Sequence, residues 1–165
     1  MACAAACHPE FVNVDLRPLV VGDAAWLAPW LPAVAASVGH DARDVASLLA
    51  RAKTDRSLRL CAIERDEEAV GVLIARDRAP RRGSALIELV ALSPDRARRG
   101  SGMRAAALIE AELVGAGASR IYAPAPAVHG IDVYFWIRLG YHPLLRTDWP
   151  CEREGVAWMV RELSA

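Results

Sequence analysis

A short arginine–glycine segment contains the residues of this sequence that are best suited to bind a ligand. It reads Arg98-Arg99-Gly100-Ser101-Gly102-Met103 and opens a run with the composition of a helix, residues 101–114. The first backbone N–H groups of a helix lack acceptors within the helix, and the helix dipole adds partial positive charge there. Glycines have no Cβ and let an anion approach the backbone closely. The segment therefore predicts a cradle for a phosphate or diphosphate, to which Arg98 and Arg99 add formal charge.

Three phosphate-bearing ligands are candidates for binding to this segment. A nucleoside triphosphate loop requires Gly-Lys-Ser/Thr, and the segment has no lysine. Gly100 to Ala105 match the Gly-x-Gly-x-x-Ala string of dinucleotide-binding folds. However, Ser93 to Arg99 separate it from the preceding strand, and no acid follows near residues 120–123. Coenzyme A, which carries a diphosphate, is the third candidate.

The wider context resembles the acetyl-CoA-binding motif of the GNAT acyltransferase superfamily. Ile87-Glu88, then Leu92-Ser93-Pro94-Asp95, precede the arginine–glycine turn as in that motif, and residues 135–141 are similar to a later helix that ends in Leu-Gly-aromatic. The element order fits from about residue 11 to 162. The resemblance implies a single-domain mixed α/β fold. Its sheet would be mostly antiparallel, with six to seven strands, about four flanking helices and central strands that splay apart to admit the pantetheine arm.

Apolar periodicity and turn residues predict the elements that position these motifs. Strands are expected at 11–16, 58–63, 69–75, 85–92, 120–123 and 155–161, and helices after Asp23 and at 42–52, 101–114 and 131–139. Asp41 is the expected N-cap of the helix at 42–52. Pro124 and Pro126 are expected to break the chain after the strand at 120–123. The run 85–92 is almost wholly apolar, which predicts a strand buried on both faces at the centre of the sheet.

The resemblance also implies further contacts with the cofactor. Backbone groups of Val90, Ala91 and Leu92 would bind the pantetheine arm, and the amides of residues 99–103 would hold the diphosphate. His129 stands where the family often has an asparagine, so it is a candidate cofactor contact. A lone histidine in a loop is more often a surface residue, and that alternative stays open.

Few residues could perform acid–base chemistry. An amine must lose a proton before it attacks a thioester, and Glu88, the acid on the buried strand, is the predicted general base, acting through a water, with a pKa raised by burial. The alternative is a structural glutamate paired with an arginine such as Arg59 or Arg76. The family's usual tyrosine donor to the leaving thiolate is replaced by Trp136, whose indole is no useful acid. Tyr134 is the nearest phenol and the candidate donor, with solvent water as the alternative.

Two functions follow from these residues. The first is transfer of an acetyl (acyl) group from acetyl-CoA to a primary amine of a small molecule, protein or peptide by direct attack on the thioester; Glu88 and the intact glycine turn favour it. The second is a non-catalytic, regulatory acyl-CoA-binding module, which the missing tyrosine favours.

Composition limits the remaining possibilities. The chain has 165 residues, 54% of them hydrophobic, which suits one domain, expected at 11–163 after a tail of residues 1–10. Twenty basic and twenty acidic side chains argue against a nucleic-acid-binding protein, although eight arginines fall between residues 76 and 104. The four cysteines suggest neither a disulfide framework nor a four-ligand metal site, and we expect reduced thiols, a cytoplasmic location and no metal. No secretory signal or membrane span is expected, and a homodimer stays open.

Overall fold

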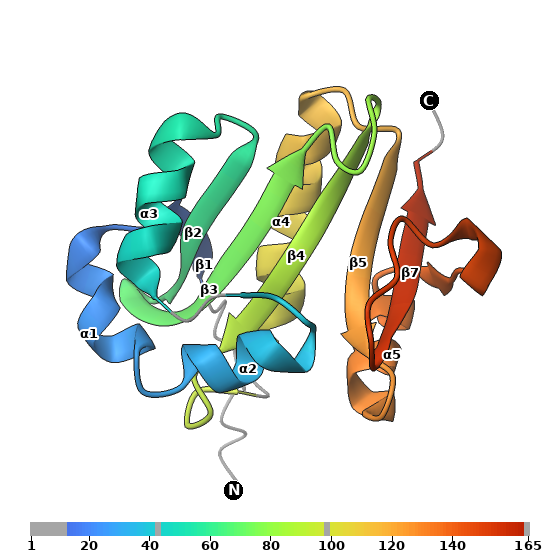
Figure 1. The fold of residues 1–165 in the computed structure, drawn as a ribbon. Coiled ribbons are helices and arrows are strands. Elements are labelled where there is room, and N and C mark those ends of the chain that lie inside the picture. Colours follow the sequence, from blue (N-terminus) through green and yellow to red (C-terminus); the bar gives the residue numbers. More distant parts are fainter. Residues whose placement is uncertain (1–12, 42–43, 98–99, 164–165) are drawn as a thin grey trace, which may run out of the picture.

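The computed structural model describes residues 13–41, 44–97 and 100–163. Within these ranges the chain forms one seven-stranded sheet in the order β1-β2-β3-β4-β5-β7-β6 (Figure 1). The strands are β1 (Val14–Pro18), β2 (Leu58–Arg65), β3 (Glu68–Asp77), β4 (Ser84–Leu92), β5 (Arg120–Pro126), β6 (His142–Pro143) and β7 (Val156–Glu162). Neighbouring strands run antiparallel except for β4 and β5, which are parallel. The predicted mixed, mostly antiparallel sheet with an apolar central strand is confirmed.

Helices cover both faces of the sheet. The described residues form the helices α1 (Ala24–Leu27), α2 (Leu31–Ser37), α3 (Val45–Thr54), α4 (Ser101–Gly115) and α5 (Gly130–Arg138). In Figure 1, α4 lies behind the sheet, and α1, α2 and α3 lie in front of it. Strand side chains alternate between the faces, so Leu73 packs in the α4 core while Val72 and Ile74 pack in the core under α1–α3. None of the helices in the described ranges is long and apolar enough to cross a membrane.

The parallel strands β4 and β5 separate along their length. They pair only from Ser84 to Leu86, opposite Arg120 to Tyr122, although β4 continues to Leu92. β5 also continues through its prolines to Pro126, so the expectation that these prolines break the chain is wrong. Ala127 donates its N–H to Gly155 on the β7 side (2.8 Å), and alternate residues of a strand face opposite neighbours. The nitrogens of both prolines therefore face the gap beside β4, where no ladder hydrogen bond is lost.

The start of α3 differs from the prediction. Asp44, not Asp41, is the N-cap, and its carboxylate accepts hydrogen bonds from the backbone N–H groups of Ala46 (3.0 Å) and Ser47 (3.2 Å). Both aspartates can cap a helix, and the buried positions Val45 and Leu48 select the helical phase that begins after the second. Val38 to Asp41 thus lie between α2 and α3 and not in the second helix.

Candidate active site

A cavity of about 560 Å³ lies where β4 and β5 diverge, and it brings most of the predicted site residues together. Its walls come from α2, the second half of β4, the start of α4, the end of β5 and α5. The predicted residues that line it are Glu88, Val90, Ala91, Leu92, Gly100, Gly102, Met103 and Tyr134. The glycine turn and the acid of β4 therefore face one shared space, as a reaction between a cofactor and a second substrate requires.

Four predicted cofactor residues are not among the described residues that line the cavity. His129 is the N-cap residue of α5, is exposed and is not among the cavity-lining residues. Ser101 is fully buried at the first position of α4. Arg98 and Arg99 lie outside the residues that the structure describes.

The turn before α4 has the chemistry of an anion site. Gly100 is the N-cap residue with φ +77°, in the left-handed region that favours glycine, and it provides no side-chain cap for the helix amides. The buried Ser101 Oγ has no hydrogen-bond partner among the described residues. A Cβ added at Gly102 would lie 3.5 Å from Phe135 Cε2 on α5, so this position faces the cavity wall without filling it. Helix amides without a side-chain cap fit the diphosphate that the sequence predicts.

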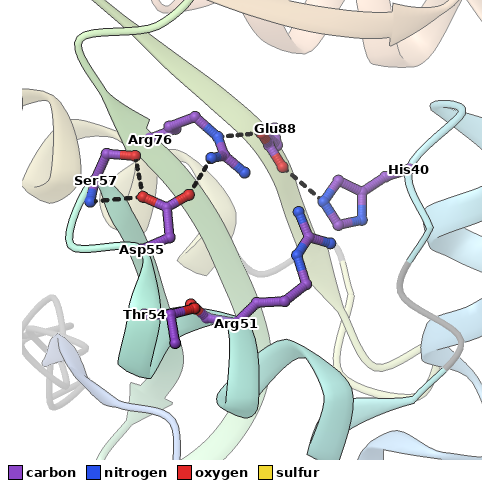
Figure 2. Close-up of polar contacts among 7 residues, drawn as sticks. All are labelled: His40, Arg51, Thr54, Asp55, Ser57, Arg76 and Glu88. Atoms are coloured by element: carbon purple, nitrogen blue, oxygen red, sulfur yellow. Dashed lines mark hydrogen bonds and ion pairs between the residues drawn. The ribbon is translucent and has the colours of Figure 1, made fainter.

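Glu88 is held on both of its carboxylate oxygens. His40 Nε2 lies 2.6 Å from Oε2, and Arg76 Nε donates to Oε1 at 3.0 Å (Figure 2). Arg76 also donates to Asp55, whose carboxylate accepts two hydrogen bonds from Ser57. Glu88 thus has features of both the general base and the structural glutamate, because it lines the cavity and is also paired with an arginine. Arg59, the other arginine considered, pairs instead with Asp77 and Glu112.

The charge state of Glu88 differs from the expectation. Burial favours the neutral acid and would raise its pKa, but the hydrogen bonds and charges of His40 and Arg76 outweigh burial and lower the pKa to about 2. The expectation of a raised pKa is therefore wrong. The carboxylate remains ionised at neutral pH.

Two aromatic side chains of helix α5 differ in how far they are exposed. Both Tyr134 and Trp136 line the cavity, but 58% of the Tyr134 surface is exposed and only 5% of the Trp136 surface. Trp136 packs edge-on against Phe135 and tilted against Tyr141, with ring centroids 5.0 and 4.9 Å apart. The difference in exposure agrees with the rotation of about 200° between residues two positions apart in a helix. Trp136 is thus mainly a packing residue.

Reasoning from the sequence missed the contribution of α2 and the connection after it. Val34, Ser37 and Val38 line the cavity opposite α5, and His40 contacts Glu88 from 48 positions earlier in the chain. No local pattern marks these residues, because their roles arise only when α2 packs over the end of β4.

Comparisons with known proteins agree with this geometry. Residues 25–141 match the acetyltransferase (GNAT) family. An acetyltransferase from Thermus thermophilus is 25% identical and superposes with a TM-score of 0.73 over 92% of this chain and 97% of that one. The PaiA N-acetyltransferase from Thermoplasma acidophilum, in complex with coenzyme A, has a TM-score of 0.69 at 11% identity over 91% of this chain and 99% of that one.

A third similar structure belongs to a longer protein. The N-acetylglutamate synthase from Neisseria gonorrhoeae, complexed with coenzyme A and N-acetyl-glutamate, has a TM-score of 0.71 at 20% identity over 93% of this chain and 36% of that one. No curated protein sequence matches significantly. The family match covers well over half of the chain, and the fold and the glycine turn agree with it. The chain therefore belongs to the GNAT family of acetyltransferases, whose cosubstrate is acetyl-CoA.

Proposed function

We propose that this protein transfers the acetyl group of acetyl-CoA to a primary amine in the cavity between β4 and β5. The proposal rests on one observation: the glycine turn of α4 and Glu88 line the same cavity. The turn would bind the cofactor, and Glu88 would act on the amine. Holding an amine and a thioester together in a fixed geometry supplies a large part of the rate gain in such reactions.

Acetyl-CoA would occupy the gap with its diphosphate at the start of α4. The backbone amides of Gly100 to Met103 would bind the diphosphate. The strand edge from Val90 to Leu92 would hydrogen-bond the pantetheine arm, because β5 separates from β4 beyond Leu86 and leaves that edge without a ladder partner. The remainder of the cavity, between α2 and α5, would hold the acceptor.

Bound acetyl-CoA supplies an activated acyl carbon, at which a C–N bond replaces the C–S bond. The nitrogen must shed a proton during this exchange, and Glu88 is the proposed acceptor, through a water. Because its pKa is about 2, Glu88 is always in the proton-accepting form but binds the proton weakly. The proton would therefore pass on to water in the cavity.

Tyr134 is the proposed donor of the proton that the leaving thiolate takes up. Its exposed ring allows water to reach the same position. We expect Tyr134→Phe to lower kcat by less than about tenfold, well below the roughly 10²–10⁴ that a positioned general acid contributes. Steady-state rates at saturating acetyl-CoA test this. A loss of more than about a hundredfold would show that water does not substitute for the phenol.

The proposed function is tested by measuring thiol release from acetyl-CoA across a panel of primary amines, with mass spectrometry of the acetylated product. We expect one free thiol for each N-acetylated amine. Saturable binding of acetyl-CoA without thiol release on any amine would contradict transfer. That result would favour the non-catalytic acyl-CoA-binding module, to which the buried Trp136 in the usual tyrosine position also points.

A further inference from the structure

We infer that His40 is the positioning residue of this site, which holds Glu88 ionised and oriented toward the amine of the acceptor. This inference rests on the proposed function. His40 lies in the connection between α2 and α3, whereas Glu88 lies on β4. The two side chains are 7% and 10% exposed, so their 2.6 Å contact is shielded from solvent.

The second ring nitrogen of His40 indicates which tautomer is present. Nδ1 is buried, and no described residue forms a hydrogen bond with it. A buried N–H without an acceptor is costly, so a neutral His40 carries its proton on Nε2 and donates it to Glu88. A protonated His40 donates the same hydrogen bond. The contact with Glu88 therefore persists in both charge states of the imidazole.

Arg76 holds the carboxylate of Glu88 from the side opposite His40. Arg76 donates to Oε1 while His40 contacts Oε2, so the carboxylate group cannot rotate freely (Figure 2). Asp55 balances the charge of Arg76. Asp132, on the opposite wall of the cavity, is the other acid in its described lining. The Glu88 carboxylate keeps lone pairs that face the cavity, where an ammonium group or the water between it and the amine can approach.

The backbone that carries His40 is fixed by two independent sets of contacts. At the end of α2, Gly39 N–H donates to Ala36 and His40 N–H donates to Ala35, both at 2.9 Å, with Gly39 at φ +64°. This is the Schellman pattern that ends a helix on a left-handed glycine. Arg153, just before β7, donates to the carbonyl of Val38 at 3.0 Å.

Arg153 is itself held in place. Its guanidinium carbon lies 5.1 Å from the centroid of the Trp158 ring on β7. A Cβ added at Gly39 would come within 2.7 Å of Arg153 Cδ, so the arginine stem packs directly on the turn. The turn at Gly39 is thus held both by hydrogen bonds to its own helix and by Arg153 in the segment before β7. This arrangement gives the imidazole one position relative to Glu88.

Two variants of His40 test the inference. His40→Ala removes the donor, leaving Arg76 alone against the burial of Glu88, so the pKa of Glu88 rises. The loss of orientation, rather than the higher pKa, should lower kcat/KM for the amine by about tenfold to a hundredfold. The pH profile of kcat/KM should gain a further inflection on its acid side, at the raised pKa of Glu88, that the wild type lacks. His40→Gln retains an N–H donor and should restore most of the activity, with KM for acetyl-CoA unchanged in both.

The controls separate positioning from folding and from the proposed function. His142→Ala removes an exposed histidine on β6 and should leave the pH profile unchanged. In a Glu88→Gln background, His40→Ala should cause no further loss of activity. If the His40 variants lose only melting temperature and keep the wild-type pH profile, the inference is wrong.

A second readout does not depend on activity. In ¹³C NMR titrations, the Glu88 carboxyl should titrate at a higher pH in His40→Ala than in the wild type, and ¹⁵N shifts of the wild-type imidazole should show the proton on Nε2. An unchanged Glu88 titration would overturn the inference. If the wild type acetylates no amine but the titration shifts as expected, the proposed function is wrong, whereas the effect of His40 on Glu88 is confirmed.

Discussion

Glu88→Gln is expected to lower kcat/KM for amine acetylation by roughly a hundredfold, the low end of what a positioned general base contributes, because a carboxylate with a pKa of about 2 is a weak base. The KM for acetyl-CoA should hardly change, because Glu88 is proposed to act on the acceptor and is not part of the glycine turn. The amide has almost no affinity for a proton, and it removes the negative charge that His40 and Arg76 surround. Steady-state kinetics with each substrate varied in turn measure both effects.

The matched control is Asp55→Asn, which weakens the far partner of Arg76 without touching the cavity lining. It should reduce stability more than activity. If Glu88→Gln and Asp55→Asn lower kcat/KM equally, Glu88 has only a structural role and the proposed proton acceptor is wrong.

The pH dependence of stability provides a further check on Glu88. Its pKa is lowered from an ordinary value of 4.5 to about 2 in the folded chain. The ionised carboxylate therefore stabilises the fold above about pH 4.5, and this contribution is lost as the pH falls toward 2. Because glutamine does not titrate, the melting temperature of Glu88→Gln should fall less steeply than that of the wild type over this range. If the melting temperatures of the wild type and of Glu88→Gln fell equally over this pH range, the low pKa of Glu88 would be contradicted.

Gly102→Glu is expected to weaken acetyl-CoA binding by at least about a hundredfold, because it places a carboxylate beside the proposed diphosphate site, where like charges repel. The added side chain would also start only 3.5 Å from the Phe135 ring and project into the cavity. Isothermal titration calorimetry with acetyl-CoA measures the change in Kd, and thermal melting checks that the variant folds.

Gly102→Ala is the control at the same position. Its methyl group would meet Phe135, Leu92 and Val90 at 3.5 to 3.8 Å, which is ordinary van der Waals contact. The alanine variant should therefore bind acetyl-CoA nearly as tightly as the wild type. Equal affinities of the glutamate and alanine variants would exclude a diphosphate next to Gly102.

The sequence predicts those parts of the fold that are encoded by local patterns. The unbroken apolar run of β4 marks the central strand, and the glycines at residues 100 and 102 mark the start of α4, because both signals act over a few neighbouring residues. Pro124 and Pro126 mislead for the opposite reason. A proline normally ends a strand, but the divergence of β4 and β5 leaves these positions without a hydrogen-bond partner to lose.

The charge of Glu88 shows why a site is harder to predict than a fold. Burial of an acid on a central strand predicts a raised pKa, and this part of the reasoning holds. The sign of the net shift is decided by His40 and Arg76, which are 48 and 12 positions away in the chain. Arg76 pairs with Glu88 because β3 and β4 are neighbours, and His40 does so only because α2 ends over the cavity. Such contacts depend on the tertiary arrangement.

We propose that the amides at the start of α4 hold the diphosphate of coenzyme A at the opening between β4 and β5. Calorimetric titration of the wild-type chain with coenzyme A and with pantetheine, which lacks the diphosphate together with the 3′-phosphoadenosine, measures this contribution. We predict one coenzyme A bound per chain and at least about a hundredfold weaker binding of pantetheine, since charge-assisted contacts to the diphosphate are lost. Equal affinity for the two compounds would contradict the claim.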